Sequence, residues 1–199
     1  MLPPPLAPGG GSVAALCGAL AGALTSMVAN LTHGKNQYRQ HWDQIEIIGV
    51  RGQELKIWFL AAIDRDTQAF NQVMMAMKLP KESSDEVTLR VKQLEIANQN
   101  AAQVPLEVME KCVELVPLLE DALYRGNPNC ISDIGVGGYC MICAAEGAAL
   151  NVLANLKNVK DQEFIRKSRE RLERTISLLR QKSVDIAKVV EAKLLPEHS

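Results

Sequence analysis

Apolar residues recur along this chain at helical spacing, without the strict alternation that marks a half-buried strand. An uncharged run over residues 13–31 consists mostly of Ala, Gly and Leu, and a second run over 131–156 is rich in Gly, Ala and Cys. Helices with such small side chains can approach their neighbours closely. The pattern therefore predicts an all-α, multihelical bundle with these two helices facing each other at its centre.

Four further stretches with helical spacing complete the predicted bundle. They cover residues 38–77, 83–103, 105–124 and 161–194. We expect a break or bend near Gly49 and Gly52 in the first of them. Pro105 is expected to open the third, because proline suits the first turn of a helix, and Pro117 to kink it.

The last stretch carries apolar residues at seven-residue intervals. They are Ile165, Leu172, Leu179 and Ile186, with Ile176 and Val190 four residues after two of them. A helix of about thirty residues spans about 45 Å, longer than a body of this size is wide. The seam therefore predicts a long C-terminal helix that holds a homo-oligomer together, most simply a dimer. The alternative is that it packs entirely against the preceding helices of its own chain.

Length and charge restrict the possible functions. The 199 residues fit one domain with an irregular segment at 1–11, and a net charge of -1 with interleaved signs gives no field to attract nucleic acid. The run 13–31 is about long enough to span a bilayer. Its small residues, together with Thr25, Ser26 and Asn30, favour a buried helix instead. We therefore predict no nucleic-acid partner and no membrane association.

The cysteines indicate a reducing compartment. Their number is odd, and three lie in Ala- and Leu-rich contexts where a free thiol behaves as a small hydrophobic side chain. Cys140-x-x-Cys143 has no second such pair and no histidine pair beside it, so we expect no metal site. The proline-rich start lacks the features of a signal peptide. The sequence thus predicts a cytoplasmic protein.

Three features could carry chemistry. Gly9, Gly10, Gly11 and Ser12 precede a helix, where exposed N–H groups suit a carboxylate or phosphate, although Ser12 could simply be the N-cap. Asp64 and Asp66 diverge by about 200° on a helix, so at most one points into any pocket. The third group is Lys35 after a C-cap glycine, Asn127 in a loop, and Asp133 at a helix start. Taken singly, each has an ordinary structural explanation.

Several motifs in order resemble the cyclodeaminase/cyclohydrolase domain of the formiminotransferase-cyclodeaminase family. They are PGGGSVAA (8–15), MVANLT (27–32), GK (34–35), DRDTQAF (64–70), LPK (79–81), VPL (104–106), GN (126–127) with SD (132–133), and NVL with NL (151–156). Together they cover most of the chain, which resembles the free-standing type. One departure is that the family usually has a short helix before the glycine motif, whereas this chain starts only a few residues ahead of it.

The resemblance implies a multihelical fold with a helical dimerisation element and a folate site without a metal or redox cofactor. Members convert formiminotetrahydrofolate to methenyltetrahydrofolate with loss of ammonia, or hydrolyse methenyltetrahydrofolate to formyltetrahydrofolate. A tetrahydrofolate derivative is then the substrate. The competing hypothesis is a non-catalytic helical scaffold or a folate-binding oligomer.

The chemistry of such a substrate suggests roles for the candidate residues. The bridging carbon of methenyltetrahydrofolate is cationic, so a carboxylate can stabilise it and move a proton. Asp133, Asp64 and Asp66 are the catalytic candidates, and we expect Asp133 to be needed for turnover rather than for folding. The anionic glutamate tail fits Lys35 or the N–H groups of residues 9–12, and Asn127 could bind the pterin.

Overall fold

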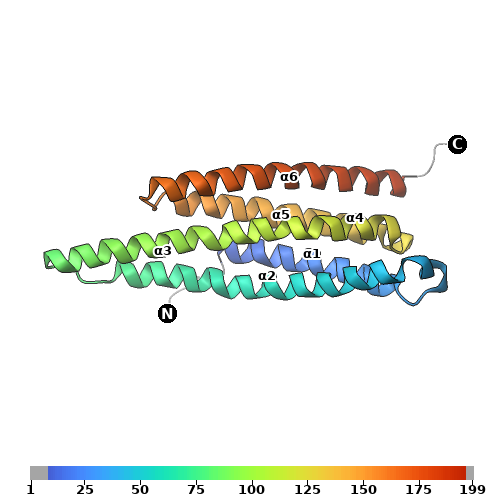
Figure 1. Cartoon of the computed structure of the whole chain (residues 1–199), viewed down its shortest axis with the longest axis horizontal. Coiled ribbons are helices and arrows are strands. Elements are labelled where there is room, and N and C mark those ends of the chain that lie inside the picture. Colours follow the sequence, from blue (N-terminus) through green and yellow to red (C-terminus); the bar gives the residue numbers. More distant parts are fainter. Residues whose placement is uncertain (1–8, 196–199) are drawn as a thin grey trace, which may run out of the picture.

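A computed structural model describes residues 9–195 of the chain as a bundle of helices (Figure 1). The elements are α1 (Gly10–Thr32), the 3-10 helix η1 (Asn36–His41), α2 (Trp42–Met77), α3 (Ser84–Lys111), η2 (Cys112–Glu114), α4 (Leu115–Arg125), η3 (Pro128–Cys130), α5 (Ile131–Leu156) and α6 (Gln162–Leu194). No strand occurs in this range, so the all-α prediction is confirmed. Residues 1–8 of the predicted irregular segment, and residues 196–199, lie outside the described part.

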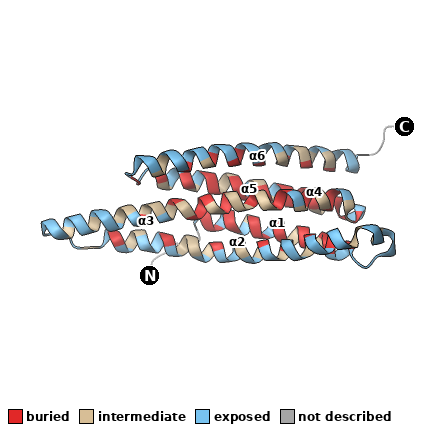
Figure 2. Cartoon of the chain, viewed as in Figure 1, coloured by how far each residue is buried: buried red, intermediate tan, exposed pale blue. Residues whose placement is uncertain are grey.

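Four helices form the body of the bundle. α1 packs on α2 and α5, and α3 packs on the same two helices from the other side. α6 lies along α5, with α3 and α4 beside it. Buried side chains concentrate where α1, α2, α3 and α5 meet (Figure 2). The two small-residue helices are therefore adjacent and central, as the sequence predicted.

Glycines bring α1 and α2 into backbone contact. A Cβ on Gly22 would lie 2.8 Å from the carbonyl oxygen of Gly52, and a Cβ on Gly52 would lie 2.9 Å from that of Gly22. α2 runs without interruption from Trp42 to Met77, so of the predicted break or bend near Gly49 and Gly52 the break is wrong. Gly52 is retained in the helix because it allows close packing, not because it ends a segment.

Two further helix boundaries differ from the prediction. α3 continues through Pro105, which is buried inside it, so Pro105 does not open a new helix. The amide that proline lacks would have bonded the carbonyl of Ala101, and that oxygen instead accepts a hydrogen bond from Asn155 Nδ2 at 2.6 Å. The chain is interrupted later, at η2, and Pro117 falls in the first turn of α4.

The predicted seam of α6 is covered by the same chain. Leu172, Ile176, Leu179, Ile186 and Val190 are each at most 7% exposed. α6 lies close because α5 offers glycines there: a Cβ on Gly135 would meet Val190 at 2.9 Å. The prediction that this seam joins two copies is therefore wrong, since its side chains are already buried within one chain.

Ion pairs on both sides of that seam hold α6 in place. Arg171 bonds Glu110 of α3, Lys182 bonds Glu120 of α4, and Arg180 bonds Glu146 of α5. These pairs are partly exposed, so each contributes little by itself to the stability. Their positions on three different helices nevertheless show that α6 belongs to the bundle of its own chain.

The two central helices are unusually apolar. α1 and the segment Pro128–Leu156 have the length and composition of membrane-spanning helices, although 61% and 44% of their most apolar windows are buried inside the protein. Core helices of a bundle have the same composition. What the bundle leaves uncovered is one side of each helix, where Val13, Leu16 and Leu20 of α1 and Val136 of α5 are exposed.

Two neighbouring leucines test whether α6 packs within its own chain. Leu179 is 0% exposed and Leu178 is 44% exposed. Leu179→Ala should lower the free energy of unfolding by about 2–5 kcal/mol, whereas Leu178→Ala should change it by under about 0.5 kcal/mol. Chemical denaturation followed by circular dichroism measures both. A Leu179→Ala loss that disappeared at high protein concentration would contradict the arrangement, because it would indicate packing between chains.

Candidate functional site

A cavity of about 320 Å³ lies beyond the N-terminus of α1. α1 begins at Gly10, whereas α2 and α3 extend further in the same direction (Figure 1). The cavity therefore occupies the place that a longer α1 would fill between α2, α3 and α5. Its lining residues are Gly9, Gly10, Gly11, Ser12, Asp66, Thr67, Ala69, Phe70, Val73, Met74, Met77, Asn98, Ala101, Asn151, Asn155 and Asn158.

A carboxylate sits against the first turn of α1. Ser12 Oγ donates a hydrogen bond of 2.9 Å to Asp66 Oδ2. A Cβ on Gly11 would lie 2.2 Å from Asp66 Oδ1, so only glycine leaves room for the carboxylate there. Gly9, not Ser12, is the N-cap of α1, because the hydroxyl of Ser12 lies inside the helix and bonds Asp66. The prediction that Ser12 caps the helix is therefore wrong.

Asparagines form one wall of the cavity. Asn151 Nδ2 donates to the carbonyl oxygen of Gly147 at 2.8 Å, Asn155 Nδ2 to that of Ala101 at 2.6 Å, and Asn98 Nδ2 to that of Asn158 at 3.0 Å. Each amide nitrogen is thus used inside the protein. The carbonyl oxygens of these side chains accept no hydrogen bond from the described residues, so this wall offers acceptors to a ligand.

Sequence reasoning did not select these asparagines as binding residues. The available signal was that Asn151 and Asn155 are four residues apart within an apolar helix, and so lie on one side of it. Asn98 could not have been found in this way, because its position opposite α5 depends on how α3 crosses the bundle.

The opposite wall is apolar and comes from α2. Phe70, Val73, Met74 and Met77 line it, and Phe70 and Met77 are 42% and 51% exposed. These two side chains therefore stand at an open edge of the cavity. A flat ring system could lie against this wall and turn its polar edge toward the asparagines. Cavities of this kind, mostly apolar with a few convergent polar groups, are typical of small-molecule sites.

The structure divides the predicted site residues into two groups. Gly9, Gly10, Gly11, Ser12 and Asp66 meet in the cavity. Asp64, two residues from Asp66, is on the exposed side of α2 and does not line the cavity, which agrees with the divergence expected on a helix.

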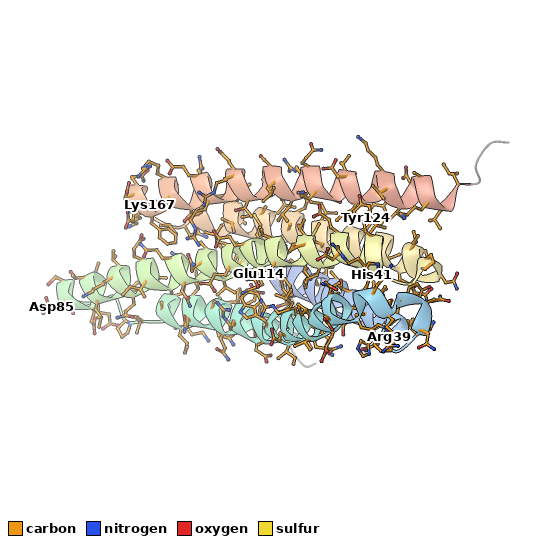
Figure 3. The ribbon with its side chains drawn as sticks, turned by 45° about the vertical axis from the view of Figure 1, so that its right-hand side comes forward. Arg39, His41, Asp85, Glu114, Tyr124 and Lys167 are labelled. Atoms are coloured by element: carbon orange, nitrogen blue, oxygen red, sulfur yellow. The ribbon has the colours of Figure 1, made fainter. Side chains whose placement is uncertain are left out.

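Lys35, Asn127 and Asp133 lie together at the other end of α1, about 35 Å away at 1.5 Å per residue. Arg39 and His41, just after Lys35, mark that end of the bundle, and Asp85 marks the opposite end (Figure 3). Lys35 and Asp133 both act on Cys130: burial and the Asp133 carboxylate raise the pKa of its thiol, and the Lys35 ammonium lowers it. Both charged side chains therefore lie near Cys130.

Asn127 has a structural role at this end. Its Oδ1 accepts from the backbone N–H of Asn129 at 3.1 Å and from Tyr38 Oη at 3.3 Å, and its Nδ2 donates to the carbonyl of Leu31 at 3.4 Å. The residue is also buried. Both ends of the amide are thus occupied within the chain, and Asn127 holds the turn against the end of α1.

The thiols are grouped but are not arranged as ligands. Cys17 Sγ and Cys143 Sγ lie 3.7 Å apart across α1 and α5. Burial, together with the hydrogen bond to Cys143, raises the pKa of Cys17 to about 11, so the thiolate form is disfavoured at neutral pH. Among residues 9–195, no three His, Cys, Asp or Glu side chains form a group that could hold a metal ion.

Comparison with known proteins assigns the chain to a family. Residues 4–174 match the family model described as Formiminotransferase-cyclodeaminase. The chain belongs to this family.

Within the family, relatives match along most of the chain. Methenyltetrahydrofolate cyclohydrolase from Methylorubrum extorquens is 36% identical over 83% of this chain and 80% of its own length. Formimidoyltransferase-cyclodeaminase from Rattus norvegicus is 34% identical over 92% of this chain, which spans 34% of the rat protein. The crystal structure of formiminotetrahydrofolate cyclodeaminase from Thermotoga maritima superposes with a TM-score of 0.85 at 30% identity, covering 97% of this chain and 92% of that one.

The glycines at the start of α1 provide a matched pair of variants. Gly11→Ala would place a Cβ against the Asp66 carboxylate, whereas a Cβ on Gly9 meets nothing within 4 Å. We expect Gly11→Ala to displace Asp66 and lower kcat/KM by at least about 10-fold, corresponding to about 1.4 kcal/mol. Gly9→Ala should stay within about 2-fold of the unmodified protein. Equal effects of the two substitutions on turnover, with both proteins folded, would mean that the Gly11–Asp66 contact is not part of the site.

Proposed function

We propose that the chain is a folate one-carbon enzyme that hydrolyses methenyltetrahydrofolate to formyltetrahydrofolate, converts formiminotetrahydrofolate to methenyltetrahydrofolate and ammonia, or does both. The observation that carries this proposal is the Asp66 carboxylate at the N-terminus of α1, in a cavity with an apolar wall on one side and amide acceptors on the other. The names of the cyclohydrolase and cyclodeaminase relatives point to the same two reactions.

The two walls of the cavity suit a reduced pterin. Its ring can lie against Phe70 and Met74, where burial of apolar surface contributes affinity. The ring N–H and amino groups of a pterin are donors, and the asparagine wall offers acceptors. Because Asn151 and Asn155 each have their Nδ2 bound to a backbone carbonyl, neither amide can rotate without losing that bond. The wall is therefore preorganised for donors.

Asp66 can act in both reactions through the same atoms. Its negative charge stabilises the cationic bridging carbon. In hydrolysis, water adds to that carbon and gives one proton to Asp66. The carboxyl returns this proton to N5 as the N5–carbon bond breaks, and the new hydroxyl loses its proton to solvent as the formyl group forms.

In the deaminase reaction, N10 attacks the formimino carbon. The formimino group reacts in its protonated form, so its nitrogen becomes NH2 when N10 attacks. Asp66 takes the N10 proton and passes it to this NH2 nitrogen, which leaves as ammonia, and the positive charge stays on the methenyl product. Ser12 donates to Asp66 Oδ2 and so leaves Oδ1 for proton transfer. Asp64 lies outside the cavity, and Asp133 is too distant within one chain to touch the same substrate.

A cytoplasmic location stays a prediction.

Asp66→Asn and Asp64→Asn are a matched pair on one helix. Asp66→Asn removes the charge but keeps an acceptor for Ser12, so the protein should fold and kcat should fall by about 100-fold on both substrates. Asp64→Asn should have no effect beyond about 2-fold. Loss of methenyltetrahydrofolate absorbance measures the hydrolase reaction, and ammonia release measures the deaminase reaction. Folate binding without turnover by the unmodified protein would instead favour a folate-binding scaffold.

The acceptor wall predicts a different kinetic effect. Asn151→Ala removes one acceptor without leaving an unpaired backbone group, because the carbonyl of Gly147 lies within α5 and keeps its helical partner. We expect KM to rise by about 10-fold with kcat almost unchanged. A change of this size corresponds to the loss of about one hydrogen bond to the substrate. Asn100→Ala is the control, since that amide bonds Gln72 away from the cavity. A fall in kcat at unchanged KM would exclude a role in substrate binding.

A further inference from the structure

A second cavity, of about 200 Å³, adjoins the one that contains Asp66. Met77, Asn98 and Asn158 line both cavities, so the two are continuous. The other lining residues of the second cavity come from α3 and from the turn that joins α5 to α6: Val91, Leu94, Glu95 and Lys160. This turn lies beside α3, beyond the start of α1 (Figure 1). The second cavity therefore extends the first toward the tip of the α2–α3 hairpin.

The first cavity has room for only part of a folate. Its volume of about 320 Å³ is at the lower end of the range of about 300–1,000 Å³ found for small-molecule sites. A folate consists of a pterin, an aminobenzoyl ring and a glutamate tail. A pterin that lies between the apolar wall and the asparagine wall fills the width of the first cavity. The aminobenzoylglutamate part must then continue out of it, and the second cavity is the adjoining space.

The sides of the second cavity suit an aromatic ring joined to an amide. Met77 of α2 and Val91 and Leu94 of α3 supply apolar surface, and burial of a ring against them contributes affinity. Asn98 stands where the two cavities meet. Its Nδ2 donates to the carbonyl oxygen of Asn158 at 3.0 Å, which leaves its Oδ1 to accept from the amide N–H of a benzoylglutamate.

Lys160 is the only cation among the described residues that line the two cavities. It is exposed and takes part in none of the ion pairs found within residues 9–195. No such ion pair has to break when its ammonium binds an anion. The flexible four-carbon side chain of a lysine also allows the charge to follow a ligand at the edge of the cavity.

Glu95 fixes the turn that carries Lys160. Its carboxylate accepts from the backbone N–H of Lys160 at 3.0 Å and from that of Asp161 at 3.0 Å, and Gln99 Nε2 donates to it at 3.1 Å. These three donors stabilise the negative charge of Glu95. The backbone at residue 160 is therefore held against α3, whereas the side chain of Lys160 is not held by Glu95 and stays available to a ligand.

We propose that the second cavity binds the aminobenzoylglutamate part of the substrate, with the ring against Met77 and Leu94 and a carboxylate of the tail on the Lys160 ammonium. This assignment rests on the proposed folate chemistry. Asp66 and Met77 are about 16 Å apart along α2 at 1.5 Å per residue. The two cavities together therefore suit a ligand whose charged tail is far from its reacting carbon.

Two lysines of the same turn test the contact with the tail. Lys160→Met should raise KM for methenyltetrahydrofolate about 5-fold with kcat within about 2-fold, because the lost ion pair is exposed and touches no reacting atom. On methenyltetrahydropteroate, which has no glutamate, the variant and the unmodified protein should have the same KM. Lys157→Met is the control, since Lys157 is exposed but lines neither cavity, and it should change neither KM.

Binding of fragments tests the second cavity without turnover. Titration with p-aminobenzoylglutamate, followed by nuclear magnetic resonance of the protein, should perturb signals of residues that line this cavity. Lys160→Met should weaken this fragment about 5-fold and leave p-aminobenzoate within about 2-fold. Leu94→Ser should weaken both fragments, because both contain the ring. Added salt should reduce the difference between unmodified protein and Lys160→Met, since exposed charges are screened.

Two results would overturn the proposal. Equal rises in KM on the substrates with and without glutamate would mean that Lys160→Met disturbs the turn and that its ammonium does not bind the tail. Unchanged KM on both substrates would mean that the tail leaves the first cavity by another route. Inactivity of the unmodified protein on both methenyltetrahydrofolate and formiminotetrahydrofolate would refute the proposed function, and the fragment titration would still decide whether the second cavity binds aminobenzoylglutamate.

Discussion

The close contact between α1 and α2 determines where the carboxylate of the cavity lies. Gly11, Gly18 and Gly22 lie seven and four residues apart, so they share one side of α1, and each meets α2 at a distance that no larger residue permits. Gly22 meets the backbone, Gly18 meets Phe59, and Gly11 meets Asp66. The same register that packs the core thus sets a carboxylate at the helix N-terminus. A shift of one residue would turn the glycines away and remove all three contacts.

Much of the fold follows from local patterns in the sequence. The central position of the two small-residue helices, the cap at Ser83 with Glu86, and the N-cap at Asp161 all depend on residues near each other in the chain. The failures were of one kind. Gly52 and Pro105 usually weaken a helix, yet here the contacts that explain them come from α1 and α5, which no local pattern specifies. The α6 seam failed similarly, because heptad spacing indicates burial without saying which chain provides it.

The site was predictable in parts but not as a whole. The glycine turn and the divergence of Asp64 from Asp66 followed from backbone geometry and helical spacing, but the sequence did not say which of the two carboxylates lines the cavity. The separation of Lys35 and Asp133 from Asp66 did not, because the order of motifs in a sequence contains no information about which ends of antiparallel helices meet. The asparagine wall combines residues from α3 and α5, and its acceptors exist only because the amide nitrogens are used elsewhere.

Pro105 links the backbone of one helix to the binding surface of another. A proline inside a helix normally leaves a carbonyl without a partner, and here that carbonyl, on Ala101, fixes the orientation of Asn155. Any other residue at 105 would restore the helical hydrogen bond and release the amide, and a different side chain at 155 would leave the carbonyl unpaired in the interior. The residues at positions 105 and 155 therefore depend on each other, because one frees the carbonyl of Ala101 and the other bonds it. Divergence in this family should change them together or not at all.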